Sequence, residues 1–170
     1  MKRPLSLKRK LAACLLITLT IPLLFCGEKK DDFRERLNYY NSRYRFRITF
    51  PENWINYSAF EMDEIIDPDL KVTAIYFALP TRSRDWQPVR LPSGYASIFS
   101  IRIFSRKEWD VFTGKYSDDK KEINSADRKI GENSSHVFMI KNATSIPVDL
   151  YFFMKEVPHV AGTFRVRADD

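Results

Sequence analysis

Beyond residue 26 the sequence contains no cysteine, because its two cysteines are Cys14 and Cys26. A domain formed by the later residues therefore has no internal disulfide, and its stability has to come from packing. The 170 residues include only five glycines and two histidines, which excludes a collagen-like repeat and leaves few histidine ligands for a metal. Hydrophobic residues make up 44% and aromatic residues 14%, so we expect one folded domain with a short appendage.

An excess of positive charge is also lacking outside the N-terminus. The formal net charge is +6, but five basic residues and no acidic ones lie within residues 1–10. The rest of the chain has 23 basic side chains against 22 acidic ones, a net charge of +1. A nucleic-acid-binding domain usually carries a clear positive excess. We therefore expect no nucleic-acid partner.

The N-terminal segment has the pattern of an export signal. After the basic residues, residues 11–25 contain no charged side chain. This run of 15 residues is shorter than the roughly 17–25 needed for a transmembrane helix. A basic start followed by a short apolar stretch is typical of a secretory signal peptide. We expect residues 1–25 to form one.

Cys26 closes the apolar run in the sequence LLFCG. This segment resembles the end of a bacterial lipoprotein signal, in which the cysteine is linked to diacylglycerol and becomes the new N-terminus. The resemblance implies lipidation of Cys26, an anchor and tether over residues 26–42, and a domain over residues 43–168 in the bacterial cell envelope, facing away from the cytoplasm. An uncleaved N-terminal anchor and ordinary secretion are the alternatives.

Alternating apolar and polar residues predict strands in the remaining chain. The clearest alternation covers residues 44–50, and Pro51 ends it because proline cannot donate to a sheet. Trp54 is expected to cover the end of the core. The acidic residues 61–69 are predicted to be a solvated loop. Further strands are expected at residues 71–79, 98–104, 129–132 and 136–141.

Helices are predicted at three places. Ser105 and Glu108 form a capping box, so a helix should begin at Arg106 and could close at Gly114. Apolar residues at helical spacing in residues 148–165 predict a second helix, which Pro158 should divide into two pieces. A short helix is also expected over residues 33–42.

Four short segments resemble those of PsbP-like domains, a group that includes thylakoid PsbP proteins, a Ran-binding nuclear import factor and bacterial DcrB-like proteins. These segments are residues 50–54, 99–109, 130–133 and 163–164. The resemblance implies an α/β (α+β) fold, an α/β/α sandwich with a mainly antiparallel sheet and helices on both faces. Members of the group share no catalytic residues, and most bind or assist other proteins.

The best candidate for a binding site is the long irregular stretch at residues 80–97. Arginine and tryptophan are the residue types that dominate interface hot spots. The candidate partner-binding residues are Arg82, Arg84, Trp86, Arg90 and Tyr95. Trp86 has an alternative role, which is to fold back on the core.

Three further arginines lie on one side of the first strand, at Arg43, Arg45 and Arg47. We expect helices and acidic residues to cover this row. An exposed row would instead suit an anionic partner or a lipid headgroup.

No catalytic, metal or cofactor site is expected. His136 and His159 lack carboxylates or cysteines at ligand spacing, and the sequence contains no hydrolase or phosphate-binding motif. We therefore expect a non-enzymatic, membrane-tethered envelope lipoprotein that binds or assists a protein partner. The alternatives are a carrier of a small or hydrophobic ligand in a cavity between sheet and helices, and an envelope hydrolase.

Overall fold

The computed structural model describes residues 29–83, 85–86, 88–116 and 127–167. The chain divides into two units, residues 1–35 and residues 36–170. Helix α1 (Lys29–Arg36) lies in the first unit except for its last residue. All other elements belong to the second unit, which is described here by itself.

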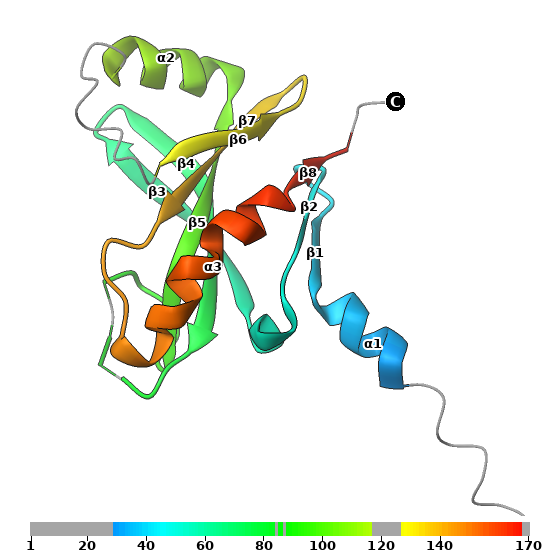
Figure 1. Ribbon diagram of the computed structural model, residues 1–170. Coiled ribbons are helices and arrows are strands. Elements are labelled where there is room, and N and C mark those ends of the chain that lie inside the picture. The colour runs from blue at the N-terminus through cyan, green and yellow to red at the C-terminus, as the bar shows by residue number, and fades with distance from the viewer. Residues whose placement is uncertain (1–28, 84, 87, 117–126, 168–170) are drawn as a thin grey trace, which may run out of the picture. The chain divides into compact units, whose positions relative to one another are not determined.

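The second unit contains two antiparallel sheets (Figure 1). The five-stranded sheet has the order β3-β4-β5-β7-β6. Its strands are β3 (Ser58–Asp67), β4 (Leu70–Pro80), β5 (Tyr95–Ser105), β6 (Arg128–Glu132) and β7 (His136–Asn142). The three-stranded sheet has the order β1-β2-β8, with β1 (Asn38–Asn41), β2 (Phe46–Thr49) and β8 (Arg165–Val166). Two antiparallel sheets together with helices confirm an α+β fold.

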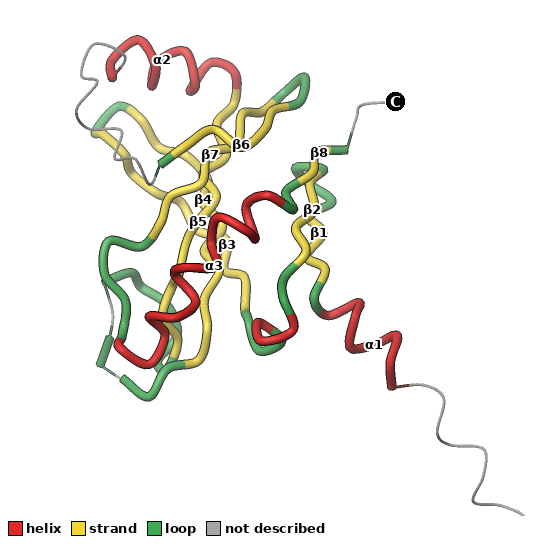
Figure 2. Tube along the Cα trace, viewed as in Figure 1, coloured by secondary structure: helices red, strands yellow, loops and turns green. Residues whose placement is uncertain are grey.

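Two helices pack on opposite faces of the five-stranded sheet. They are α2 (Arg106–Tyr116) and α3 (Tyr151–Gly162), the latter preceded by a short 3-10 helix, η3 (Val148–Leu150) (Figure 2). Successive side chains of a strand point to opposite faces. In β7, Phe138 and Ile140 belong to the core under α3, whereas Val137 and Met139 belong to the core under α2. The predicted helices on both faces are therefore present.

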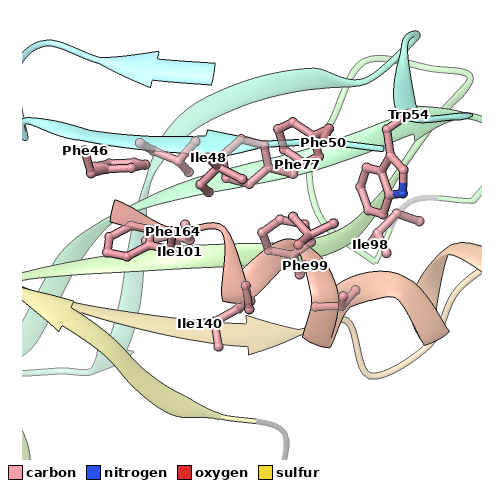
Figure 3. Close-up of a cluster of buried hydrophobic side chains, with 14 of the residues drawn as sticks. Phe46, Ile48, Phe50, Trp54, Phe77, Ile98, Phe99, Ile101, Ile140 and Phe164 are labelled. Atoms are coloured by element: carbon pink, nitrogen blue, oxygen red, sulfur yellow. The ribbon is translucent and has the colours of Figure 1, made fainter. Parts of the chain in front are cut away.

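The larger core lies between the five-stranded sheet on one side and β2 and α3 on the other (Figure 3). Phe46 and Ile48 point inward from β2, whose burial alternates along the strand. The rings of Phe77 and Phe99 stack with centroids 4.9 Å apart. Trp54, in the 3-10 helix η2 (Glu52–Trp54), is fully buried and covers the end of this core as predicted. Side chains thus fill the space between sheet and α3.

The capping box predicts the start of α2 correctly. The Glu108 side chain accepts a hydrogen bond from the Ser105 N–H at 2.7 Å, and the Ser105 hydroxyl accepts one from the Glu108 N–H at 3.3 Å. Trp109 and Phe112 face the smaller core. The helix continues past Gly114, the expected end, to Tyr116.

Three sequence predictions are wrong. Residues 61–69 are mostly strand β3 rather than a loop, because pairing with β4 satisfies their backbone. Residues 33–42 contain the end of α1 and strand β1 rather than one helix. Helix α3 is continuous through Pro158, which removes a single N–H while Val157, Val160 and Ala161 keep the helix packed on the core.

Candidate functional site

The connection between β4 and β5, residues 81–94, is the loop that the sequence singled out. The Thr81 N–H donates to the Gly94 carbonyl at 2.8 Å and closes the base of the loop. Gly94 has a φ of +83°, a conformation that favours glycine. Leu91 is buried. The loop is therefore fixed at its base and partly packed against the domain.

The structure describes four of the five predicted binding residues, which are Arg82, Trp86, Arg90 and Tyr95. Arg82 and Arg90 are exposed. Tyr95 lies in β5 and packs its ring edge-to-face against Phe60, with centroids 5.6 Å apart. Arg84 lies outside the described residues, as does Cys26.

Trp86 takes the alternative role that the sequence left open. Its ring is partly buried and packs against the larger core. Its indole N–H is buried and has no hydrogen-bond partner within the part of the chain that the structure describes. Trp86 therefore holds the loop against the domain instead of extending from it.

The structure adds an exposed apolar patch that the sequence analysis missed. It consists of Val148, Tyr151 and Phe152, whose exposed fractions are 93%, 60% and 62%. Residues at this spacing in a helix are neighbours on one face. The signal was present in the sequence, since these three residues fall opposite the inward face of the predicted helix.

Asp149 connects the apolar patch to the loop. Its carboxylate accepts hydrogen bonds from the Thr81 hydroxyl at 3.0 Å and from the Arg82 backbone N–H at 2.9 Å. The Arg82 N–H, followed by the Thr81 hydroxyl, holds the pKa of Asp149 below its ordinary value. These contacts place the Arg82 backbone beside Asp149, the residue that follows Val148 of the apolar patch.

A pocket of about 290 Å³ lies on the five-stranded sheet next to the same loop. Pro88 and Val89 of the loop line it, together with Glu64, Tyr76 and Lys141 from the sheet. Burial and the nearby Glu64 carboxylate raise the pKa of Tyr76 to about 12. The pocket therefore has both apolar and polar lining residues, and the Tyr76 phenol is protonated at physiological pH.

Glu64 is the centre of a charged network beside this pocket. Arg102, which is buried, donates to both carboxylate oxygens at 3.1 and 2.6 Å, and Lys141 donates at 3.0 Å. Burial raises the pKa of Glu64, but the hydrogen bonds and charges of Arg102 and Lys141 outweigh it and lower the pKa to about 2. Asp127 lies 3.7 Å from Arg102, and burial raises its pKa.

This network is better suited to joining strands than to catalysis. Glu64 is in β3, Arg102 in β5 and Lys141 in β7, so the three side chains connect the sheet across its width. A general acid or base works best with a pKa near the operating pH. Glu64, with a pKa of about 2, is far from that range.

The two histidines occupy separate environments. His136 packs edge-to-face against Tyr44 with ring centroids 5.3 Å apart, and burial lowers its pKa. His159 is exposed on α3. Among the described residues, no group of three or more His, Cys, Asp or Glu side chains is placed to hold a metal ion.

Comparisons with family models, curated proteins and solved structures found no match to this chain. The resemblance to PsbP-like domains therefore stays a prediction from short segments. None of the helices in the described ranges is both long and apolar enough to cross a membrane.

Proposed function

We propose that this chain is a lipid-anchored, non-enzymatic protein of the bacterial cell envelope that binds a protein partner. The apolar patch of Val148, Tyr151 and Phe152 carries this proposal. Contiguous exposed apolar side chains on a soluble domain mark interaction sites, because leaving them in water is unfavourable. Aromatic residues also contribute disproportionately to interface energy.

The charges around the apolar patch suggest the chemistry of the partner. The Arg82 backbone lies beside Asp149, and Lys155 is exposed one turn further along α3. Buried apolar anchors surrounded by a polar rim are the usual arrangement of a protein interface. The partner surface should therefore offer an apolar pocket with a polar edge.

Anchoring at Cys26 is the second part of the proposal, and the sequence supports it. The apolar run ends at Cys26, and residues 27–170 contain no cysteine for a competing disulfide. Two or more acyl chains hold a protein firmly at a membrane, whereas one short chain binds marginally. The patch would then face partners within the envelope.

The filled core argues against a carrier with a cavity between sheet and α3. Phe50 stacks on Tyr57 with centroids 4.1 Å apart, and Trp54 packs edge-to-face on Phe153 at 5.4 Å. Such packing leaves no room for a ligand among these side chains. A small polar ligand in the pocket beside Glu64 is the form of the carrier hypothesis that remains.

Photo-crosslinking in intact cells tests the proposed interface. A photoreactive amino acid replaces Phe152, and the matched control carries it at Val111, which is 44% exposed on α2. We expect a discrete crosslinked protein from position 152 and none from position 111. The variant F152D should lower the yield of that product from a probe at Tyr151 at least tenfold, since a charge cannot enter an apolar pocket.

Equal products from both positions, or an unchanged yield in F152D, would contradict the proposed interface. Point variants are preferable to deleting the loop, because deletion would remove Leu91 and Trp86 from the core. In the same cells, mass spectrometry of the mature N-terminus should find Cys26 as the first residue, carrying a lipid. An unmodified Cys26 would refute lipid anchoring without bearing on the crosslink.

A further inference from the structure

Lys141 is a basic side chain that lines a pocket, unlike the predicted row of arginines. Arg43, Arg45 and Arg47 of that row are exposed, rather than covered by helices as expected. Arg43 forms an ion pair with Glu61 at 2.9 Å. Salt screens exposed charges, so they hold small ions weakly. The Lys141 side chain is only 32% exposed and lies in the pocket of about 290 Å³ beside the loop, which is the better place for a small ligand.

The floor of this pocket is a row of polar side chains across three strands. Tyr76 of β4 is the cross-strand partner of Ser100 in β5, and Ser100 lies opposite Lys141 of β7. Cross-strand partners share one face of a sheet. Lys141 is two residues from Met139, which belongs to the core under α2, so the row lies on that same face. The loop and residues 143–145 form the rest of the lining.

Ser100 departs from the pattern expected of a central strand. Strand β5 is the middle strand of five, and its buried residues are mostly apolar. Ser100 is only 3% exposed, and its hydroxyl has no hydrogen-bond partner among the described residues. Burying a hydroxyl without a partner is unfavourable. Residues that break such a local rule are often functional, and a ligand in the pocket would supply the missing partner.

Hydrogen-bond donors are available in this pocket, whereas the Glu64 carboxylate is already occupied. Glu64 accepts two hydrogen bonds from Arg102 and one from Lys141. The Tyr76 phenol donates a fourth. A carboxylate has about four acceptor sites, and an ammonium has three N–H donors. Two N–H groups of Lys141 and the Ser100 hydroxyl therefore remain for a ligand.

The balance of charge favours an anionic ligand. Arg102 neutralises Glu64, which leaves the charge of Lys141 facing the pocket. Asp127 lies 3.7 Å from Arg102 and does not line the pocket. Hydrogen bonds between an ammonium and an oxyanion are about twice as strong as neutral ones. A single positive charge suits a carboxylate better than a doubly charged phosphate.

We propose that the pocket beside Glu64 binds a small monocarboxylate with a short apolar chain. Its volume of about 290 Å³ equals that of about ten water molecules, which accommodates a ligand of this size. The carboxylate accepts hydrogen bonds from Lys141 and Ser100, and the apolar chain lies against Pro88 and Val89 of the loop. The site shares no residue with the apolar patch, so it is independent of the proposed protein interface.

NMR titration of chain 27–170 with butyrate tests this proposal. This chain contains every buried residue of the described domain, so its core is complete. We expect saturable shifts of the Ser100, Lys141 and Val89 amides, with a dissociation constant on the order of 1 mM for so small a ligand. Butyramide, which has a similar shape and no charge, should bind at least tenfold more weakly. Inorganic phosphate should also bind more weakly than butyrate.

The variant S100A should lower the affinity for butyrate about tenfold, since it removes one donor to a charged group. Its denaturant midpoint should equal that of the unchanged chain, because the Ser100 hydroxyl has no partner to lose among the described residues. The matched control S42A removes a hydroxyl from an exposed turn and should bind butyrate within twofold of the unchanged chain.

Three results would overturn the proposal. They are butyrate shifts that do not saturate or that fall outside the pocket, butyramide or phosphate binding as tightly as butyrate, and an unchanged affinity in S100A. None of them bears on the crosslink at Phe152 or on the lipid at Cys26.

Discussion

Glu64 shows how one side chain can depend on residues far away in the chain. Its carboxylate is paired with Arg102, 38 residues away, and Lys141, 77 residues away. Its side chain is 14% exposed, so solvent screens these contacts weakly. Removing one partner of such a buried network leaves an uncompensated charge, which is usually more costly than losing a surface pair.

The lowered pKa of Glu64 predicts a specific loss of stability in acid. The folded value of about 2 lies below the ordinary 4.5, so the contribution is fully present above pH 4.5 and is lost as the pH falls toward 2. We expect wild type to exceed E64Q in unfolding free energy by on the order of 3 kcal/mol at pH 7. Denaturant unfolding of both chains from pH 7 to pH 2 measures the difference, which should shrink across that window.

Asp63 supplies the matched control on the same strand. It forms an ion pair with Lys71 at 2.6 Å, with both side chains 61% exposed. Because exposed pairs contribute about 0–1 kcal/mol, D63N should change stability little at any of these pH values. A pH-independent deficit in E64Q would mean that the network acts through shape and not through the charge of Glu64.

Among the elements, β6 contains a glycine that permits the segment after α3 to pack closely against it. Gly131 lies opposite Phe138 in β7, and a Cβ on it would come within 2.7 Å of the Phe164 ring. Phe164 is buried and follows α3, so the ring has little freedom to move. Glycine at residue 131 therefore allows the segment after α3 to approach the sheet.

A pair of glycine variants tests this close approach. We expect G131A to lower the unfolding free energy by about 1–3 kcal/mol, since an added methyl overpacks a filled site. G114A, on α2 with open space around its Cβ, should instead raise it by about 0.5–1 kcal/mol through helix propensity. Thermal unfolding of the two variants compares them directly. An unchanged midpoint for G131A would mean that the Phe164 ring can shift.

For some of the helices and strands, local sequence patterns are sufficient to predict the element. Strand β2 and the start of α2 follow from residues within a few positions of one another. The acidic composition of residues 61–69 favours a loop, yet β3 extends through Asp67 and pairs with β4. Strands β1 and β8, with four and two residues, are too short to stand out in a sequence.

For the molecule as a whole, two hydrophobic cores on opposite faces of one sheet stabilise a domain that has no cysteine to form a disulfide. The buried hydrophobic residues of the described chain all lie between Leu37 and Phe164. The unit from residue 36 onward therefore contains the interactions that stabilise it.

This distribution predicts that residues 27–35 do not stabilise the domain. We expect chain 36–170 to unfold cooperatively at the same urea midpoint as chain 27–170. The unfolding free energies of the two chains should agree within about 0.5 kcal/mol, as is usual for changes outside the core. Circular dichroism in a urea series measures both. A clearly lower midpoint for the shorter chain would show that α1 contributes to the stability of the second unit.

The candidate site was predictable in part. The composition of the loop singles out residues 81–94, where Arg82 and Arg90 are exposed. The sequence does not predict whether the Trp86 side chain points toward the core or toward solvent. An aromatic ring in a loop takes one direction or the other according to the surface beneath it. The apolar patch can be recognised only once the solvent-facing side of α3 is known, because Tyr151 and Phe152 are exposed on that side.

The sequence by itself determined the uneven charge, the cysteine-free domain, the alternation of β2 and the capping box of α2. Each of these depends on residue counts or on neighbours a few positions apart. The tertiary structure alone decided that Arg47 faces Arg165 and that Glu64 meets Lys141. Such contacts depend on the register and order of strands that pair across the chain, and pairing is set by the packing of the whole domain rather than by local pattern.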